Sequence, residues 1–190
     1  MHATDLSPQQ LAQATPDPRI RFLAAPAEAS GLADDSCDLI TIAQALHWFC
    51  HDSFYTEVRR VLKPGGIIAA WTYTLLDAKP SINAVIKQFH DHTVGPWWPP
   101  ERKWVDLGYV GMPFPFAEFP AARFTISREW SIVQLLDYVG TWSAVQRYRA
   151  ETGHDAILEL HERLEAVWDK PDQVRTIRWP LAIRCGRKAG

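Results

Sequence analysis

The sequence predicts an α/β fold built on a mostly parallel β-sheet, and three of its features lead to that class. Residues 37–43 (CDLITIA) and 66–73 (GIIAAWTY) are short apolar runs rich in β-branched residues, typical of strands buried on both faces. Residues 51–66 (HDSFYTEVRRVLKPGG), between them, show helical periodicity. A strand, a helix and a second strand at this spacing form a βαβ unit, which closes right-handed in a parallel sheet.

The opening residues predict another strand that runs into a helix. An apolar stub ends at Asp5, Ser7 can cap a helix and Pro8 suits its first turn, so we expect a helix near residues 7–14. Residues 19–25 (RIRFLAA) predict the next strand. A strand, an Asp and a helix in this order normally lie inside a nucleotide-binding domain rather than at its start.

The central helix has recognisable ends. Asp52 or Ser53 is expected to cap it, and residues 64–66 (PGG) are expected to end it before the next strand. Its apolar face consists of Phe54, Val58, Val61 and Leu62.

Residues 79–120 differ in composition from the rest of the chain. A helical pattern over residues 79–92 is followed by stretches rich in proline and aromatic residues. Because long irregular segments in compact domains are usually lids or binding loops, we interpret residues 79–120 as a lid-like insertion. The whole chain, 1–190, is then a single partial domain.

The last third of the chain alternates between strand and helix patterns. Residues 123–131 predict a strand, and residues 131–149 a helix that breaks near Gly140. Residues 154–170 predict an amphipathic helix. Residues 176–185 predict a closing strand, in which a proline at position 180 requires a bulge or an edge.

Composition fits a soluble domain with a hydrophobic core. The chain has 190 residues, of which 47% are apolar and 22% charged, and its formal net charge is −2. This balance indicates neither nucleic acid nor a membrane surface as a partner. Three cysteines without paired spacing (Cys37, Cys50 and Cys185) argue against a disulfide framework. No secretory signal follows Met1 and no apolar run could span a bilayer, so we expect a cytoplasmic protein.

Three stretches resemble the class I S-adenosylmethionine-dependent methyltransferases. These are residues 22–49 (FLAAPAEASGLADDSCDLITIAQALHWF), residues 54–73 (FYTEVRRVLKPGGIIAAWTY) and residues 141–149 (TWSAVQRYR). VLKPGG is common across the superfamily, whereas AQALHWF and TWSAVQRY are more discriminating. They look like the methyltransferase type 11 branch that includes trans-aconitate methyltransferase. The resemblance covers nearly the whole chain and implies a Rossmann-like sandwich whose last strand is antiparallel.

The resemblance implies S-adenosyl-L-methionine as the cofactor. Asp5 would accept hydrogen bonds from the ribose hydroxyls, although an Asp before Ser-Pro also serves as a helix cap. Pro26 stands where relatives often have an Asp for the adenine amino group, so Glu28 replaces that contact or the contact is missing. Gln44 would face the sulfonium and methionine part. The implied cofactor residues are Asp5, Leu6, Ala27, Glu28 and Gln44.

The resemblance also implies an aromatic pocket for the methyl acceptor. Its residues follow the fourth and fifth strands of the fold and the TWS segment: His47, Trp48, Trp71, Tyr73, Trp142 and Tyr148. Ordinary core packing is the alternative for these side chains. Methyl transfer needs in-line placement and exclusion of water, so no catalytic residue is assigned, and His47 is the candidate base for a weaker nucleophile.

The acceptor implied by this branch is a small molecule, with a carboxylate or another oxygen as the methylated group. A polycarboxylate would require cations, and the candidates are Arg102, Lys103, Arg147 and Arg149. A zinc site built from His47, Cys50 and His51 with His90 and His92 is the metal alternative. Because a zinc site needs four ligands and His47 with Trp48 already belongs to the family pattern, we expect no metal.

The family's sheet places its first strand, followed by a Gly-rich loop, between the second and fourth strands. This sequence begins at the second strand, so we expect the first strand and the loop to be lacking and the cofactor product to bind weakly. The flanking strands then either close on each other or keep open edges that invite self-association. The alternative function is a catalytically inactive, truncated remnant that binds a ligand or a partner; a dinucleotide-dependent dehydrogenase is disfavoured.

Overall fold

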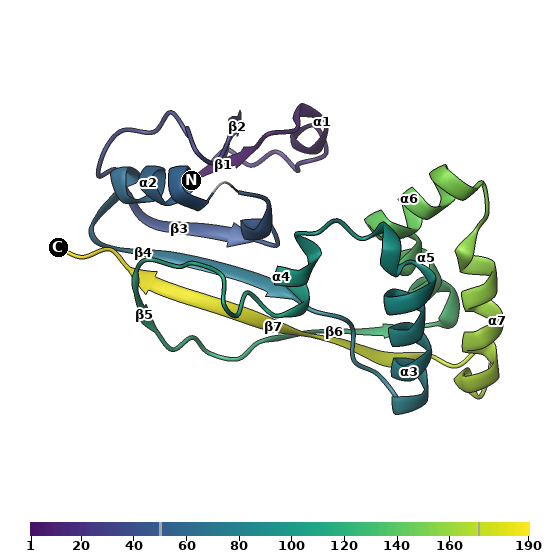
Figure 1. The fold of residues 1–190 in the computed structure, drawn as a ribbon. Coiled ribbons are helices and arrows are strands. Elements are labelled where there is room, and N and C mark those ends of the chain that lie inside the picture. The colour runs from purple at the N-terminus through teal and green to yellow at the C-terminus, as the bar shows by residue number, and fades with distance from the viewer. Residues whose placement is uncertain (50, 171) are drawn as a thin grey trace. The chain divides into compact units, whose positions relative to one another are not determined.

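A computed structural model describes residues 1–49, 51–170 and 172–190 (Figure 1). The chain forms two compact units, which are described separately. The first unit comprises Met1–Thr72, Gly111–Ala121 and Ile183–Gly190, and the second comprises Tyr73–Val110 and Ala122–Ala182. The interpretation of residues 1–190 as one partial domain with a lid stays a prediction.

In the first unit, the opening strand and helix form as expected. β1 (His2–Asp5) and β2 (Arg21–Ala24) pair in parallel. α1 (Pro8–Leu11) is capped by the Ser7 hydroxyl, which accepts a hydrogen bond from the backbone of the third helical residue at 3.3 Å. The helix is shorter than predicted because none of its residues is buried, and a short helix without packing is only marginally stable.

The predicted βαβ unit is confirmed. β3 (Cys37–Ala43) and β4 (Leu62–Tyr73) pair in parallel, and α2 (His51–Val61) connects them. Figure 1 shows α2 next to β3 and β4. The expected apolar face of α2 is buried, at Phe54, Val58, Val61 and the adjoining Leu62.

Both ends of α2 differ from the prediction. The helix already includes His51, so Asp52 and Ser53 lie inside its first turn and do not cap it. β4 follows α2 directly and includes residues 64–66, which were expected to form a turn. The reason is pairing with the end of the chain, since the amide of Gly65 donates to the Lys188 carbonyl at 3.2 Å.

Burial of β3 also differs from the prediction, because only one face of this strand is packed. Ile42 is 5% exposed, whereas Leu39 is 55% exposed. In β4, by contrast, Ile68 and Ala70 are fully buried. Within the described residues β3 pairs with β4 alone, so an apolar run identified the strand correctly but not the burial of both its faces.

The final strand, β7 (Arg175–Arg187), is antiparallel to its partners β5 and β6, as expected. In the first unit it pairs with β5 (Ala117–Phe119), and the sheet order is β3-β4-β7-β5. The sequence analysis missed β5, because three exposed residues carry no periodicity. β1 and β2 form a separate two-stranded sheet in the described part of the chain.

The second unit is mainly helical. Its helices are α3 (Pro80–Gln88), α4 (Arg102–Asp106), α5 (Ile132–Gly140), α6 (Ser143–Thr152) and α7 (Ala156–Trp168). β6 (Thr125–Trp130) pairs with β7, and Pro180 lies where this ladder ends, opposite Thr125. The predicted helix break near Gly140 is confirmed.

The second unit has its own hydrophobic core. α3, α5 and α7 pack together (Figure 1) and contribute fully buried leucine and isoleucine side chains. α7 contributes Leu160, Leu164 and Trp168, the face expected from its periodicity. Among the described residues, no helix has the length and apolar character needed to cross a membrane.

Candidate active site

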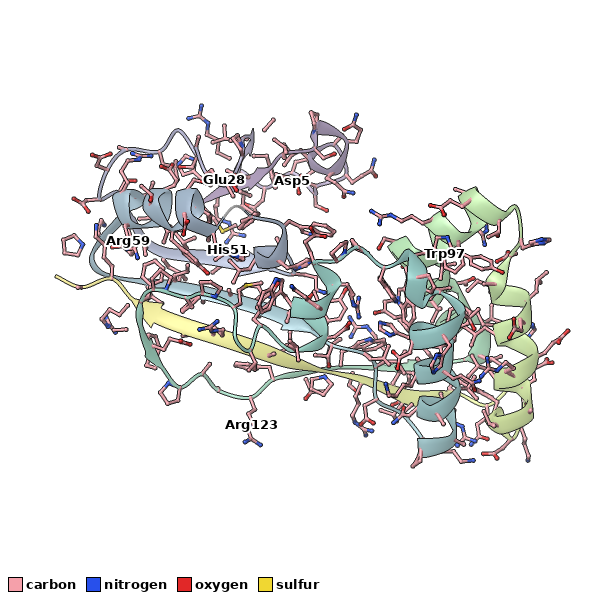
Figure 2. The ribbon with its side chains drawn as sticks, in the orientation of Figure 1. Asp5, Glu28, His51, Arg59, Trp97 and Arg123 are labelled. Carbon is pink, nitrogen blue, oxygen red and sulfur yellow. The ribbon has the colours of Figure 1, made fainter. Side chains whose placement is uncertain are left out.

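The carboxyl ends of β1 and β2 bring predicted cofactor residues to one edge. Asp5 ends β1 opposite Ala24 of β2, and its carbonyl accepts a hydrogen bond from the amide of Ala25 at 3.2 Å. Ala27 and Glu28, both half-buried, follow in the loop after β2. Figure 2 labels Asp5 and Glu28. Parallel strands end at the same edge of a sheet, which is where α/β folds bind ligands.

The Asp5 carboxylate does not cap α1, because Ser7 holds the N-cap position. Its Oδ1 accepts a hydrogen bond from the amide of Ser7 at 2.7 Å, which is the turn-forming role. Within the described chain Oδ2 has no hydrogen-bond partner, so it can accept from a hydroxyl. The neighbouring Leu6 is 73% exposed and leaves an apolar surface beside this carboxylate.

Glu57 of α2 holds the loop that follows β2. The amide and hydroxyl of Ser30 donate to Glu57 Oε1 at 2.8 and 2.6 Å, and Arg60 donates to both carboxylate oxygens at 2.8 Å. The hydrogen bonds from Arg60 are the main cause that lowers the pKa of Glu57 to about 2, and those from Ser30 add to the effect. Burial acts in the opposite direction. The ionised carboxylate therefore fixes the loop that carries Ala27 and Glu28.

Gln44 has an uncommon backbone conformation at the end of β3. Its φ is 54°, in the left-handed region, and its amide donates to the Trp71 carbonyl at 2.9 Å. Its side-chain Oε1 accepts a hydrogen bond from the buried hydroxyl of Thr72 at 2.7 Å. A non-glycine residue costs about 1–2 kcal/mol in this region, and such strain concentrates at functional sites.

Three predicted acceptor residues lie near Gln44 in the first unit. His47 and Trp48 belong to a 3₁₀ turn (Leu46–Trp48) directly after β3. The His47 ring is buried, with its centroid 4.8 Å from that of the exposed Trp48. Trp71 lies in β4 opposite Ala43, the last residue of β3. The structure therefore brings these three residues to the carboxyl ends of β3 and β4.

The other three predicted acceptor residues belong to the second unit. The ring centroid of Trp142 is 6.1 Å from that of Tyr138. The pKa of Tyr138 is raised chiefly by burial and to a lesser extent by the nearby Tyr73. Tyr148 instead packs against Trp97, with 4.7 Å between centroids. Tyr73 and Trp142 thus share one cluster, and Tyr148 contacts a different residue.

The same cluster contains His90, which the sequence analysis considered only as a metal ligand. His90 lies in a π-helical turn (Phe89–Thr93), is 6% exposed, and packs against the rings of Trp98 and Trp142 at 4.9 and 5.8 Å. Its Nδ1 is 2.7 Å from the Asp91 carboxylate, which can only accept, so Nδ1 carries the proton. Its buried Nε2 makes no hydrogen bond and is 3.8 Å from Asp106 Oδ1.

Burial favours the neutral form of His90. Burial lowers its pKa, and the charge of Arg102 acts in the same direction, against the Asp91 hydrogen bond. Arg102 is the predicted cation that joins this cluster. Its guanidinium lies 4.3 Å above the Trp98 ring, and its Nε donates to Asp106 at 2.8 Å. The other predicted cations, Lys103, Arg147 and Arg149, are exposed on the second unit.

A metal site finds no support in the described residues. They contain no group of three or more His, Cys, Asp or Glu side chains placed to hold a metal ion. The alternative that joins His47 and His51 through Cys50 depends on a residue outside the described part of the chain.

Comparison with known proteins identifies the family. A family model described as a methyltransferase domain matches residues 1–70. The chain is 41% identical to a protein from Anaeromyxobacter dehalogenans classed as a type II methyltransferase. Its solved structure matches with a TM-score of 0.90, over 100% of this chain and 81% of that one. This chain belongs to the class I S-adenosylmethionine-dependent methyltransferases. The family and fold expected from the sequence are confirmed.

The curated relatives of this methyltransferase are longer than the chain itself. A Dictyostelium discoideum protein classed as a methyltransferase is 28% identical, over 86% of this chain and 63% of the relative. An uncharacterized methyltransferase of Schizosaccharomyces pombe is 27% identical, over 74% of this chain and 55% of the relative. The methyltransferase chain described here therefore spans about three fifths of the length of these relatives.

Several side chains next to the candidate residues of each unit were missed by the sequence analysis. Glu57 was assigned only to a helix, and Thr72 only to a strand. For His90, the local indication in the sequence is the adjacent Asp91, whose carboxylate can orient the imidazole ring. Its burial depends on Trp98 and Trp142, whose positions the sequence pattern does not give.

Proposed function

We propose that this methyltransferase binds S-adenosyl-L-methionine at the carboxyl ends of its strands and methylates an oxygen atom of a small-molecule acceptor. The observation that carries the proposal is Asp5 at the end of β1, beside the loop that begins at Ala25. Its Oδ2 fits a ribose hydroxyl, and the loop offers the amide of Ala27 to adenine. The strained Gln44 supports the same edge as a functional one.

The proposed cofactor residues are Asp5, Leu6, Ala27, Glu28 and Gln44. When bound, the cofactor supplies a methyl group activated by a sulfonium. The residues of the chain then have to orient the two reactants and exclude water. A carboxylate nucleophile needs no base, so no catalytic residue is required for it. For a weaker oxygen nucleophile His47 is the proposed base.

The proposed acceptor residues remain His47, Trp48, Trp71, Tyr73, Trp142 and Tyr148. Aromatic side chains bury a large apolar area with few residues, which suits a small organic ligand. The proposal that the acceptor carries a carboxylate is supported by Arg102. Its side chain is 18% exposed, and stacking on Trp98 orients its planar fork of donors.

The cofactor proposal is tested by titrating the chain with S-adenosylhomocysteine and following backbone amides by NMR, which measures weak binding. We expect saturable shifts at residues 5–6, 27–28 and 44. Asp5→Asn retains the hydrogen bond from Ser7 but weakens acceptance from ribose, so we expect about tenfold lower affinity. Asp52→Asn, an exposed carboxylate in α2, is the matched control. Binding with equal affinity in Asp5→Asn and wild type would contradict the assignment.

The next measurement distinguishes methyl transfer from the alternative function, a catalytically inactive module that binds a ligand or a partner. Binding of S-adenosylhomocysteine without methyl transfer to any of a panel of small carboxylic acids would favour it. Self-association is a further prediction, supported by β1 and β3, each of which pairs on one side among the described residues. Sedimentation across a concentration series tests it, and a constant monomer mass would contradict it.

A further inference from the structure

A cavity of about 300 Å³ lies in the first unit, away from the residues assigned to cofactor or acceptor. Arg59, at the last turn of α2, and Pro115, Phe116 and Ala117 line it together with Arg187 and Lys188 at the end of β7. The amide of Lys188 donates to the carbonyl of Gly66, near the start of β4, at 2.9 Å. The cavity therefore lies at the amino-terminal end of β4.

The cavity and the proposed cofactor edge are at opposite ends of this strand. Gln44 bonds to the carbonyl of Trp71, five residues beyond Gly66 along β4. At about 3.3 Å per residue, the two positions are separated by roughly 17 Å. A small ligand in the cavity would not touch Gln44.

The cavity carries positive charge that the described residues neutralise only in part. Arg59 donates to the Pro115 carbonyl at 3.3 Å, and Arg187 donates to the Gly65 carbonyl at 2.7 Å. Among the described residues, no carboxylate lies within 4 Å of either guanidinium. Lys188 is the third cation, and it pairs with Asp35 at 2.8 Å.

This arrangement differs from that of the other basic side chains nearby. Arg60 pairs with two carboxylates, Lys63 with Asp38 and Arg184 with Glu118. Arg21, an exposed residue of β2, is the other arginine of the first unit without a carboxylate partner in the described chain. Two unpaired arginines at one cavity, in a chain with a formal net charge of −2, form a local anion-attracting site.

The two guanidinium groups are also oriented. That of Arg59 lies 5.5 Å from the ring centroid of Phe116, and that of Arg187 lies 5.8 Å from the ring centroid of Phe119. Stacking on an aromatic ring and a hydrogen bond to a carbonyl each restrict a flexible side chain, so less entropy is lost when a ligand binds. Arginine forks match the oxygens of phosphate and carboxylate groups.

We propose that this cavity binds a small organic dianion, a phosphate monoester or a dicarboxylate, whose apolar part contacts Phe116 and Pro115. The dianion matches the two unpaired arginines in charge. The cavity volume is at the lower end of the range for small-molecule sites, which limits the ligand to a few carbon atoms beyond its anionic group. The site is independent of the proposed methyl transfer, since it shares no residue with that function.

The probes are phenyl phosphate and phthalate as dianions, benzoate as a monoanion and phenol as a neutral molecule. Each probe is added stepwise to the protein in chloride buffer of constant ionic strength, and binding is followed by NMR. We expect saturable binding of at least one dianion, at least fivefold weaker binding of benzoate, and none of phenol. Binding of phenol as tight as that of the dianions, or no saturation by either dianion at millimolar concentration, would overturn the proposal.

Three variants test the residues. Arg59→Gln and Arg187→Gln are each expected to weaken dianion binding at least fivefold, and Arg59→Lys less than Arg59→Gln. Arg21→Gln is the matched control, an exposed and unpaired arginine of the same unit outside the cavity, and should leave the affinity unchanged. Circular dichroism confirms that each variant is folded. An equal loss in Arg21→Gln would show a general charge effect and overturn the site. Figure 2 labels Arg59.

Discussion

Replacing Glu57 by glutamine tests how the loop after β2 is held. Glutamine has the same shape and can still accept hydrogen bonds from Ser30, but it cannot form the ion pair with Arg60. In the native protein the pKa of Glu57 falls from 4.5 to about 2, chiefly through Arg60. Because the folded protein lowers this pKa, the ionised carboxylate stabilises the fold.

The size of the effect follows from the same values. The difference between 4.5 and about 2, at about 1.4 kcal/mol per pKa unit, corresponds to about 3 kcal/mol. The side chain of Glu57 is 10% exposed but that of Arg60 is 35% exposed, so solvent screens part of the attraction. We expect Glu57→Gln to lower the free energy of unfolding by about 1.5–2 kcal/mol at pH 7. For a chain of this length, this corresponds to about 3–8 °C in Tm.

The sign of the pH dependence is fixed by the direction of the pKa change. The stabilisation is fully present above about pH 4.5 and is lost as the pH falls toward 2. Urea unfolding of wild type and Glu57→Gln between pH 6 and pH 2.5 measures the difference, with Glu162→Gln, an exposed carboxylate of α7, as the control. A difference below 0.5 kcal/mol at pH 7, or one that stays constant over this range, would refute the reasoning.

Three further predictions concern single side chains. Thr72→Val removes the hydroxyl that donates to Gln44, so we expect a loss of about 1 kcal/mol in unfolding free energy by urea titration, and an unchanged value would argue against that hydrogen bond. His90→Phe keeps an aromatic ring, slightly larger than imidazole, and removes both a buried nitrogen without a partner and the hydrogen bond to Asp91, so its Tm should stay within about 3 °C of wild type, whereas His90→Ala should cost about 2–4 kcal/mol; similar losses in both variants would be evidence against this explanation. Leu164→Ala opens a cavity in the helical core, and calorimetry should show a loss of about 2–5 kcal/mol, while Leu158→Ala on the exposed face of α7 should change stability by less than 1 kcal/mol; equal losses would contradict the packing.

Much of the fold could be predicted from local pattern. β3 matches the predicted boundaries, and α5 and α6 separate near Gly140, because periodicity and turn residues act within a few positions. The predictions that failed concern residues whose contacts are distant in the sequence. β4 begins at Leu62 because that residue pairs with Cys37 of β3 and Gly65 bonds to Lys188, and one face of β3 is exposed because nothing in the described chain covers Leu39.

The site was predictable to a similar extent. Asp5 and Ala27 lie at one edge because strand order alone places the carboxyl ends of β1 and β2 together. The left-handed backbone of Gln44 gave no signal, because glycine is the residue that usually marks this conformation. The burial of His90 Nε2 depends on Trp98 and Trp142, eight and fifty-two positions further along the chain, and no periodicity reports it.

The sheet that carries Asp5 has little to hold it in place. β1 and β2 have four residues each, and neither these strands nor α1 contains a buried residue. Two-stranded sheets of this kind are marginally stable in water, so the amide protons of residues 2–5 and 21–24 should exchange with solvent faster than those of β4. A ligand that binds there must use part of its affinity to order these strands. Slower deuterium uptake at these amides would then report occupancy directly.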